Sequence, residues 1–341
     1  MRIRILLYFS LFIFASLLLM SAGKMLQSPT PIAFKIPKGF PKPPTNIFKN
    51  NPLTEEGFQL GKKLFYDGRL SKDGQVSCAS CHQQYAAFST YDHDLSHGVN
   101  NSFSTRNAPG LINLAWMTQW QWDGGINHIE MQPLAPMTAA NEMGETLDSI
   151  LFKIKADTSY RRLFKNAFGD ANITSAKMLK ALAQFTGSLV SADSKYDKVK
   201  RGEAKFIEPE EKGYELFKAN CNSCHREPLF TDNSFRNNGL GLNRFKDIGR
   251  QAISLQKGDS LKFKVPTLRN VGLTIPYMHD GSFSTLDKIL DHYTSLDTAS
   301  AIIDPLLKKK INLNSKEKKQ LILFLYTLTD TAFAKNPRFM P

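Results

Sequence analysis

The chain has 341 residues, of which 42% are hydrophobic and 22% charged, and its formal net charge is +13. This length suits two domains of ordinary size, and this composition is that of a globular protein rather than a disordered one. The lysines are scattered and no nucleic-acid-binding motif occurs, so the charge favours an acidic protein partner or an anionic membrane surface over nucleic acid.

The first residues have the pattern of an export signal. Two arginines precede an apolar run of sixteen residues from 5 to 20, and Ser21 and Ala22 follow. A basic start, an apolar stretch and small residues are typical of a secretory signal peptide, so we predict that residues 1–22 are a cleaved signal. A membrane span needs about twenty apolar residues, so an uncleaved tether to the inner membrane is the alternative.

The remaining chain has few signals other than helices and loops. Residues 23–52 are rich in proline, asparagine and lysine and predict an extended leader laid over the surface. Thr54 followed by two glutamates has the pattern of a capped helix start. Helical periodicity predicts further helices at residues 146–155, 159–168, 174–189, from 210 onward and from 314 or 315 onward. No convincing run of alternating strand residues occurs, so we predict a mainly α fold with long loops.

Two five-residue stretches, 78–82 and 221–225, share the pattern Cys-x-x-Cys-His. This pattern is the attachment signature of c-type haem, because two thiols add to the haem vinyl groups and the adjacent imidazole binds the iron. A thioredoxin-like or zinc site is the alternative for a single copy, but two copies ending in histidine, with no cysteine left over, argue against it. The predicted attachment and iron-binding residues are Cys78, Cys81, Cys221, Cys224, His82 and His225.

The haem motifs bear on location and on domain organisation. Bacteria attach c-type haem outside the cytoplasmic membrane, which agrees with export to the periplasm. A weak repeat, Gly-x-x-Leu-Phe at 61–65 and 213–217, precedes each motif. We therefore predict two cytochrome c-like domains with one covalent haem each, at 53–200 and 201–341, with the polar stretch 193–205 as the linker.

Residues 103–144 have a composition that core packing does not require. All three tryptophans fall within seven positions, and acidic and amide side chains follow closely. The simplest reading makes the tryptophans core and the acids surface. The order of the motifs in and beyond this segment indicates something more specific.

From about residue 55 to 330 the chain resembles the bacterial dihaem cytochrome c peroxidase family, including its MauG-like members, which oxidise a protein substrate. The shared motifs occur in the family's order: the first Cys-x-x-Cys-His, Arg106–Pro109, Trp122–Gly124, Gln132, Pro136, Glu142-Met143, the second Cys-x-x-Cys-His, Phe230–Asp232, Pro266–Asn270 and Tyr277–Gly281.

The resemblance implies unlike roles for the two haems, which we name the N-haem (His82) and the C-haem (His225). The N-haem would bind peroxide, with Gln132 and Glu142 on its distal side. Heterolytic O–O cleavage needs one group to move a proton and one to orient the peroxide, and we assign these tasks to Glu142 and Gln132. Trp122 matches a tryptophan that relays electrons between the haems.

The resemblance also implies a calcium ion between the domains. Asn107, Thr274 and Pro276 match positions that supply its oxygen ligands, and calcium prefers hard oxygen ligands that include backbone carbonyls. The alternative for Asn107 is a simple turn residue.

The distal ligand of the C-haem distinguishes the branches of the family. Reductively activated peroxidases have methionine fourteen positions after the histidine of the His-Asp-Gly motif, and here that position is Tyr293. MauG-like members have tyrosine there, and an anionic oxygen ligand stabilises oxidised iron whereas a thioether raises the potential. We therefore predict Tyr293 as the ligand and the MauG-like branch, with His292 and Met278 as rivals.

The loop after the first motif bears on the resting state of the N-haem. Reductively activated peroxidases place a removable histidine on this iron, whereas MauG-like members leave the position open. His97 lies near the expected offset, but a lone loop histidine is more often solvated than a ligand.

The leading functional prediction is a periplasmic dihaem peroxidase that reduces hydrogen peroxide to water. Its electrons would come from a small cytochrome c, a cupredoxin or an oxidisable protein. The alternatives are a MauG-like oxidase that modifies a protein and, from another class, a dihaem electron carrier without an open iron. Family members are often homodimers, although no apolar stripe in this sequence argues for one.

Overall fold

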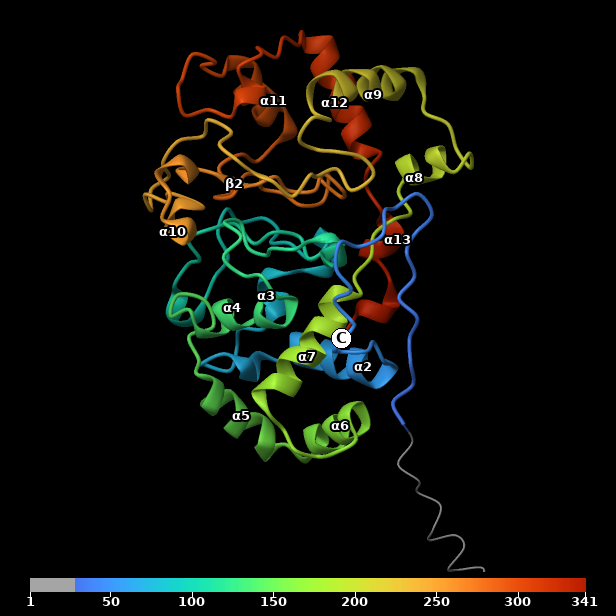
Figure 1. Cartoon of the computed structure of the whole chain (residues 1–341), viewed down its shortest axis with the longest axis vertical. Coiled ribbons are helices and arrows are strands. Elements are labelled where there is room, and N and C mark those ends of the chain that lie inside the picture. Colours follow the sequence, from blue (N-terminus) through green and yellow to red (C-terminus); the bar gives the residue numbers. More distant parts are fainter. Residues whose placement is uncertain (1–27) are drawn as a thin grey trace, which may run out of the picture.

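The computed structural model describes residues 28–341, and the predicted signal peptide lies outside this range. Figure 1 shows two lobes stacked along the long axis. The first lobe contains α2 (Glu55–Phe65), α3 (Cys78–Cys81), α4 (Leu134–Thr138), α5 (Leu147–Ala156), α6 (Thr158–Phe168) and α7 (Ser175–Gly187). The second contains α8 (Lys195–Lys200), α9 (Glu208–Asn220), α10 (Gln251–Ser254), α11 (Leu286–Ser295), α12 (Ser315–Tyr326) and the short strands β1 (Phe235–Arg236) and β2 (Phe263–Lys264).

The loops that link these elements contain 3-10 turns. Their bounds are η1 (Gly68–Leu70), η2 (Gln84–Ala86), η3 (Val99–Asn101), η4 (Leu114–Trp116), η5 (Ile129–Met131), η6 (Lys257–Asp259), η7 (Pro305–Leu307) and η8 (Pro337–Phe339). Sheet structure within residues 28–341 is confined to the antiparallel β1–β2 pair. The prediction of a mainly α fold is confirmed. In the same range, the helices are all too short or too polar to cross a membrane.

The predicted helices begin where capping side chains occur in the sequence. The Thr54 hydroxyl accepts a hydrogen bond from Gly57 N at the start of α2, and Thr146 and Thr174 cap α5 and α7 in the same way. Asn314 caps α12 and exchanges hydrogen bonds with Glu317. These caps satisfy amide groups that the first helical turn leaves without a partner.

The prediction that residues 193–205 form a plain linker is wrong, because this stretch contains α8. Ser194 caps the helix, and its residue Tyr196 is 2% exposed and packs edge-on against Phe230. Asp197 accepts two hydrogen bonds from the fully buried Arg269 at 2.8 and 2.9 Å. The polar composition therefore reflects a buried ion pair as well as solvated residues.

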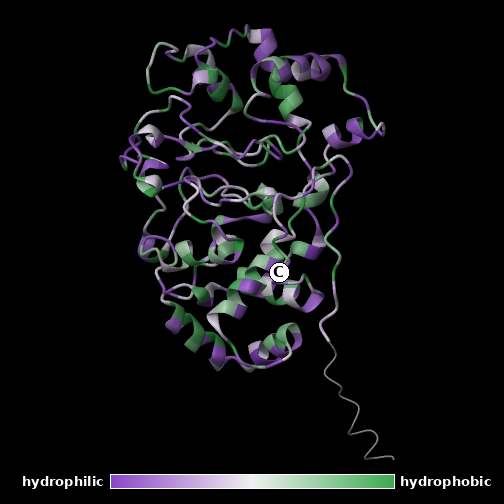
Figure 2. Ribbon diagram, viewed as in Figure 1, coloured by the Kyte–Doolittle hydropathy of each residue, from purple (hydrophilic) through white to green (hydrophobic). Residues whose placement is uncertain are grey.

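Each lobe has its own hydrophobic core. One cluster joins α2, α5, α6 and α7, and the other joins α9, α11 and α12. Figure 2 shows that the helices of both lobes carry hydrophobic and hydrophilic faces. After α12 the chain returns to the first lobe through α13 (Thr331–Ala334), where Phe333 and Phe339 join the first cluster. The domain boundaries at 53–200 and 201–341 stay a prediction.

The leader residues from 28 to 52 contain no helix or strand and run along the side of the molecule (Figure 1). Pro41 O accepts a hydrogen bond from Trp116 Nε1 at 2.8 Å, and Phe40 packs on both Trp116 and the guanidinium of Arg269. The leader is therefore held by residues of both lobes.

The repeated glycines mark the closest helix crossings. Gly61 of α2 lies against α7, and a Cβ at this position would stand 1.9 Å from Ala181 O. Gly213 of α9 lies against α12, where a Cβ would stand 2.0 Å from Gln320 O. Because the obstructing atoms are backbone, they cannot rotate away. The repeat thus gives each lobe the same crossing between the helix before the haem motif and a later helix.

We expect Gly61→Ala to lower the free energy of unfolding by about 1–3 kcal/mol, because the added methyl group forces two packed helices apart. Gly258→Ala is the matched control, since a Cβ there would meet nothing within 4 Å. Denaturant unfolding of both holoproteins measures the difference. Equal stability of the two variants would contradict the crossing geometry.

Candidate active site

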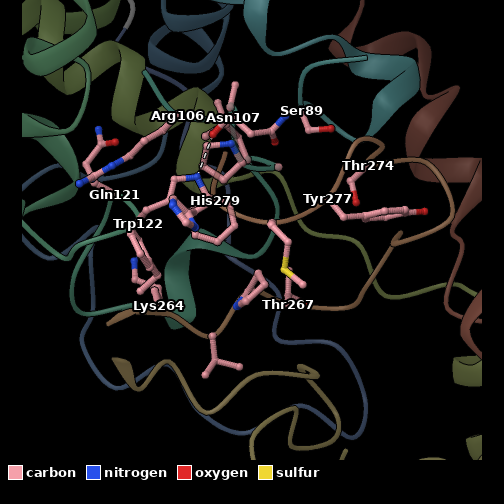
Figure 3. Close-up of a pocket in the computed structure, with 18 of the residues that line it drawn as sticks. Ser89, Arg106, Asn107, Gln121, Trp122, Lys264, Thr267, Thr274, Tyr277 and His279 are labelled. Atoms are coloured by element: carbon pink, nitrogen blue, oxygen red, sulfur yellow. Dashed lines mark hydrogen bonds between the residues drawn. The ribbon is translucent and has the colours of Figure 1, made fainter. Parts of the chain in front are cut away.

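Both Cys-x-x-Cys-His motifs line one large cavity between the lobes. Its volume is about 750 Å³, and its walls include all four cysteines, His82 and His225. Residues from both lobes face it, as Figure 3 shows for Arg106 and Trp122 of the first lobe and His279 and Lys264 of the second. The two motifs, 143 positions apart, therefore open into a common space.

The two motif histidines are oriented alike. His82 Nδ1 lies 2.8 Å from Phe88 O, and His225 Nδ1 lies 3.1 Å from Pro266 O. A carbonyl oxygen only accepts, so each Nδ1 carries the proton and each Nε2 keeps a lone pair. Burial lowers the pKa of both imidazoles, which favours the neutral, ligating form.

Two buried N–H groups support the fit of a haem. Within residues 28–341, Trp120 Nε1 and Arg236 Nε have no hydrogen-bond partner, and both residues line the cavity. Buried donors are rarely left unpaired, and the carboxylates of a haem are acceptors that could pair with them. The thiols, the imidazole lone pairs and these donors together fit covalent haem in this cavity.

Gln132 and Glu142 lie near the first motif. Both line the cavity and are half-buried, Gln132 at the end of η5 and Glu142 on the turn after α4. Burial raises the pKa of the Cys81 thiol, and the charge of Glu142 raises it further, so the carboxylate lies close to the first motif. Burial also raises the pKa of Glu142 itself. Their catalytic roles stay a prediction.

His97 stands in a loop that packs on the backbone of Glu142. Val99 N donates to Glu142 O at 2.8 Å, and a Cβ at Gly98 would stand 2.7 Å from the same oxygen. The imidazole of His97 is exposed, packs on Phe103 with ring centroids 4.6 Å apart, and lines the cavity. The predicted role of His97 as a removable ligand stays untested.

Trp122 is fixed by both lobes. Its Nε1 donates to Asn107 O at 2.8 Å, and its carbonyl accepts from Lys264 N at 2.7 Å. Figure 3 shows the indole beside Lys264 on the wall of the pocket. The wall that Trp122 occupies is made by both lobes, and its predicted role as a relay stays a prediction.

An ion cluster joins the lobes next to this tryptophan. Arg106 donates to Asp123 and, through Nε and Nη2, to both oxygens of Asp247 at 2.6 and 2.9 Å. Burial opposes the charge of Asp247, but the guanidinium outweighs burial and holds the pKa of this carboxyl below its ordinary value. Asp123 directly follows Trp122, so the cluster also fixes the tryptophan's backbone.

We expect Arg106→Leu to lower the free energy of unfolding by about 3–5 kcal/mol, because it leaves two buried carboxylates without the guanidinium. Arg244→Leu is the control, since Arg244 pairs with Asp94 across the lobes at an exposed position and should cost about 0–1 kcal/mol. Denaturant unfolding of the two holoproteins checks the prediction, and equal losses would contradict it.

The three predicted calcium positions, Asn107, Thr274 and Pro276, all line the cavity. Asn107 Nδ2 donates to Asp94 O at 3.1 Å, which leaves the amide oxygen as the atom for a cation. Residues 28–341 contain no cluster of three or more His, Cys, Asp or Glu side chains placed to hold a metal ion. The expected ligands are of other types, so calcium stays a prediction.

The candidate ligands of the C-haem lie together in the second lobe. Tyr293 of α11 and Met278 line the cavity, whereas the neighbouring His292 does not. His292 Nε2 lies 2.9 Å from Asn238 O, which fixes its proton on Nε2 and removes that lone pair. Of the three rivals, Tyr293 and Met278 therefore remain available as ligands.

Sequence reasoning missed several residues at this site. Asp247 and Lys264 lie outside every motif found in the sequence. Arg106, Asp123 and His279 lie within such motifs, but the sequence alone assigned them no role. His279 is 3% exposed and stacks on Phe263 with ring centroids 3.6 Å apart. Lys264 is 7% exposed, and burial lowers its pKa to about 8. Three of these five residues lie in recognisable motifs, but the motifs do not indicate which side chains they contact.

Two comparisons with known proteins decide the family. The family model described as di-haem cytochrome c peroxidase matches residues 55–205. The methylamine utilization protein MauG of Methylorubrum extorquens is 36% identical over 303 residues, which cover 86% of this chain and 83% of that protein. The chain belongs to the di-haem cytochrome c peroxidase/MauG family. The resemblance stated from the motifs is confirmed, and the family implies two c-type cytochrome domains with one haem each.

Two other proteins are similar to this chain at a comparable level, and a more distant one shares its fold. Cytochrome c551 peroxidase of Nitrosomonas europaea is 32% identical over 333 residues, covering 92% of this chain and 90% of that protein. A MauG-like protein associated with microbial copper homeostasis, known from a crystal structure, is 35% identical to this chain in sequence. The two structures superpose with a TM-score of 0.83, and the match covers 91% of this chain and 99% of that protein's chain. The diheme peroxidase BthA of Burkholderia thailandensis, at 20% identity and a TM-score of 0.71, shows the shared fold.

Proposed function

We propose that this chain is an exported dihaem peroxidase that reduces hydrogen peroxide to water, with electrons from a small redox protein. The observation that carries this proposal is one cavity lined by both haem motifs together with Glu142, Gln132 and Trp122. A pure electron carrier does not need a carboxyl and an amide near the open face of its haem.

The chemistry is divided between the cofactor and the chain. An N-haem held by Cys78, Cys81 and His82 would supply the redox-active iron for peroxide reduction. Glu142 takes the proton from the inner peroxide oxygen and delivers it to the leaving oxygen, which departs as water. The raised pKa of this carboxyl brings it closer to the working pH. Gln132 donates an N–H that orients the peroxide.

The rest of the cavity serves electron flow. Trp122 connects the two haem sites: its indole donates to Asn107 O of the first lobe, and its backbone carbonyl accepts from Lys264 N of the second. Tyr293 would supply an anionic oxygen ligand to a C-haem held by Cys221, Cys224 and His225, and such a ligand favours oxidised iron. The second site would therefore suit storage of an oxidising equivalent until an electron donor arrives.

The proposal also includes export, the domain boundary, a calcium ion and an electron donor, as predicted from the sequence. Residues 1–22 direct export to the periplasm, the haem domains divide near residue 200, and calcium binds at Asn107, Thr274 and Pro276. The donor is a cytochrome c, a cupredoxin or an oxidisable protein with an acidic surface, since the chain carries a formal net charge of +13.

The second candidate is a MauG-like oxidase that modifies a partner protein. Tyr293 in the cavity and 36% identity to MauG favour it. The MauG-like structure associated with copper homeostasis suggests a copper protein as one partner to test.

Steady-state peroxide turnover separates the two candidates. The peroxidase proposal predicts sustained peroxide consumption with reduced cytochrome c or cupredoxin as donor. If neither donor supports turnover while peroxide drives oxidation of side chains in a co-encoded protein, the oxidase is correct. If the protein fails to react with peroxide both at rest and after half-reduction, both candidates fail.

A further inference from the structure

Asn238 lies among the three residues that compete for the distal face of the C-haem, and it hydrogen-bonds two of them. It follows β1 and lines the cavity beside Tyr293 and Met278. Its Nδ2 donates to Met278 Sδ at 3.3 Å, and its carbonyl accepts from His292 Nε2 at 2.9 Å.

The orientation of this side chain is fixed by its own turn. Asn238 Oδ1 accepts from Leu240 N at 3.2 Å, so the amide nitrogen is the end that faces the cavity. The neighbouring Asn237 is 2% exposed, and its carbonyl accepts from Asp304 N at 3.0 Å. Gly239 follows at φ +80°, a conformation that glycine adopts without strain. Asn238 is therefore presented by a segment with little freedom to turn.

We propose that Asn238 is a positioning residue that selects Tyr293, over Met278 and His292, as the distal ligand of the C-haem iron. The inference rests on the proposed ligation by Tyr293. The Asn238 carbonyl holds the proton on His292 Nε2, so this nitrogen has no lone pair for iron. One Nδ2 hydrogen engages the Met278 thioether, and in the ligated protein the other would donate to the Tyr293 oxygen.

The thioether of Met278 and the phenolate of Tyr293 differ in strength as hydrogen-bond acceptors, in a direction that favours tyrosine. A thioether is a weak acceptor, so its hydrogen bond alone holds Met278 loosely. A hydrogen bond to an ionised oxygen is roughly twice as strong as one between neutral groups, so the same amide stabilises a ligating phenolate more than it stabilises the displaced sulfur. Removing the amide should therefore weaken Tyr293 and release Met278 together.

The test compares haem-loaded Asn238→Leu protein with the wild type by electron paramagnetic resonance and by redox titration. Leucine keeps a similar volume without N–H donors. We expect most of the His/Tyr low-spin signal to be lost, a His/Met signal to replace it, and the C-haem midpoint potential to shift upward, because thioether ligation raises it. The double variant Asn238→Leu/Met278→Leu should recover the His/Tyr signal.

Control variants distinguish the selecting role of Asn238 from the ligation of iron by Tyr293, on which it rests. Asn166→Leu makes the same change at an exposed position of α6 in the other lobe and should leave the spectrum unchanged. An unchanged ligand set in Asn238→Leu, or failure of the double variant to restore tyrosine, would overturn the selecting role of Asn238. If Asn238→Leu does not fold with both haems, Asn238→Ala carries the same comparison. If the wild type lacks a tyrosinate signal and Tyr293→Phe changes nothing, ligation by Tyr293 itself is wrong.

Discussion

Replacement of Glu142 by glutamine is expected to slow peroxide-driven oxidation of the holoprotein by about 10²–10⁴-fold, the usual contribution of a positioned proton-transfer group. Glutamine keeps the size and hydrogen-bonding capacity of the side chain but cannot accept the peroxide proton. Stopped-flow spectra recorded after mixing the resting protein with peroxide measure the rate. The first haem should still be bound and spectrally normal in this variant, because Glu142 is not an iron ligand.

Glu130→Gln is the matched control for this substitution. Glu130 stands on η5, two positions before Gln132, but does not line the cavity. Its variant should react with peroxide at the wild-type rate. Equal rates for wild type and Glu142→Gln would remove Glu142 from the mechanism, and equal slowing in both variants would indicate a general electrostatic effect instead.

The pH dependence follows from the same carboxyl. Burial raises the pKa of Glu142 above its ordinary value, and the group must be ionised to accept a proton. The peroxide reaction should therefore slow as pH falls through this raised pKa. Folding stability changes in the opposite direction: a carboxyl whose pKa is raised by burial lowers stability as pH rises above its ordinary pKa, and the full loss is reached above the raised pKa. Glu142→Gln should thus be at least as stable as wild type at neutral pH although much slower.

Replacement of Trp122 by phenylalanine should separate the two haem sites. Peroxide should still oxidise the first site, but oxidation of the second site should be mostly lost, because the indole that connects them and its hydrogen bond to Asn107 are gone. Rapid-scan absorbance spectra after peroxide addition follow both sites separately.

Trp116→Phe makes the same chemical change away from the cavity. Trp116 is 3% exposed, bonds the leader through Pro41 and does not line the haem cavity. We expect wild-type spectral changes in this control. Retained oxidation of the second site in Trp122→Phe would show that electrons pass by another route.

Local features of the fold were predictable from the sequence because their causes are local. Thr54, Thr146, Thr174 and Asn314 precede apolar periodic segments, and each caps a helix. The haem motifs were recognisable because attachment needs two thiols and an imidazole within five residues. The helix α8 was missed because its stabilising ion pair joins Asp197 to a residue 72 positions away.

The site was predictable only where chemistry required a particular residue type. Glu142, Gln132 and Trp122 were singled out from motif order, and the structure places all three on the cavity wall. Asp247 and Asn238 gave no signal, because an aspartate or asparagine in a loop is ordinary until its partner is known. Arg106 and Asp247 stand 141 positions apart, and only the folded chain brings them together.

Electron paramagnetic resonance of the resting ferric holoprotein, followed by addition of peroxide without prior reduction, tests the proposed peroxidase mechanism most directly. The mechanism predicts a high-spin signal from an open N-haem, a low-spin His/Tyr signal from the C-haem, and rapid loss of the high-spin signal with peroxide. Two low-spin signals and no reaction would contradict it. A reaction that requires prior half-reduction would instead make His97 the ligand that closes the first site.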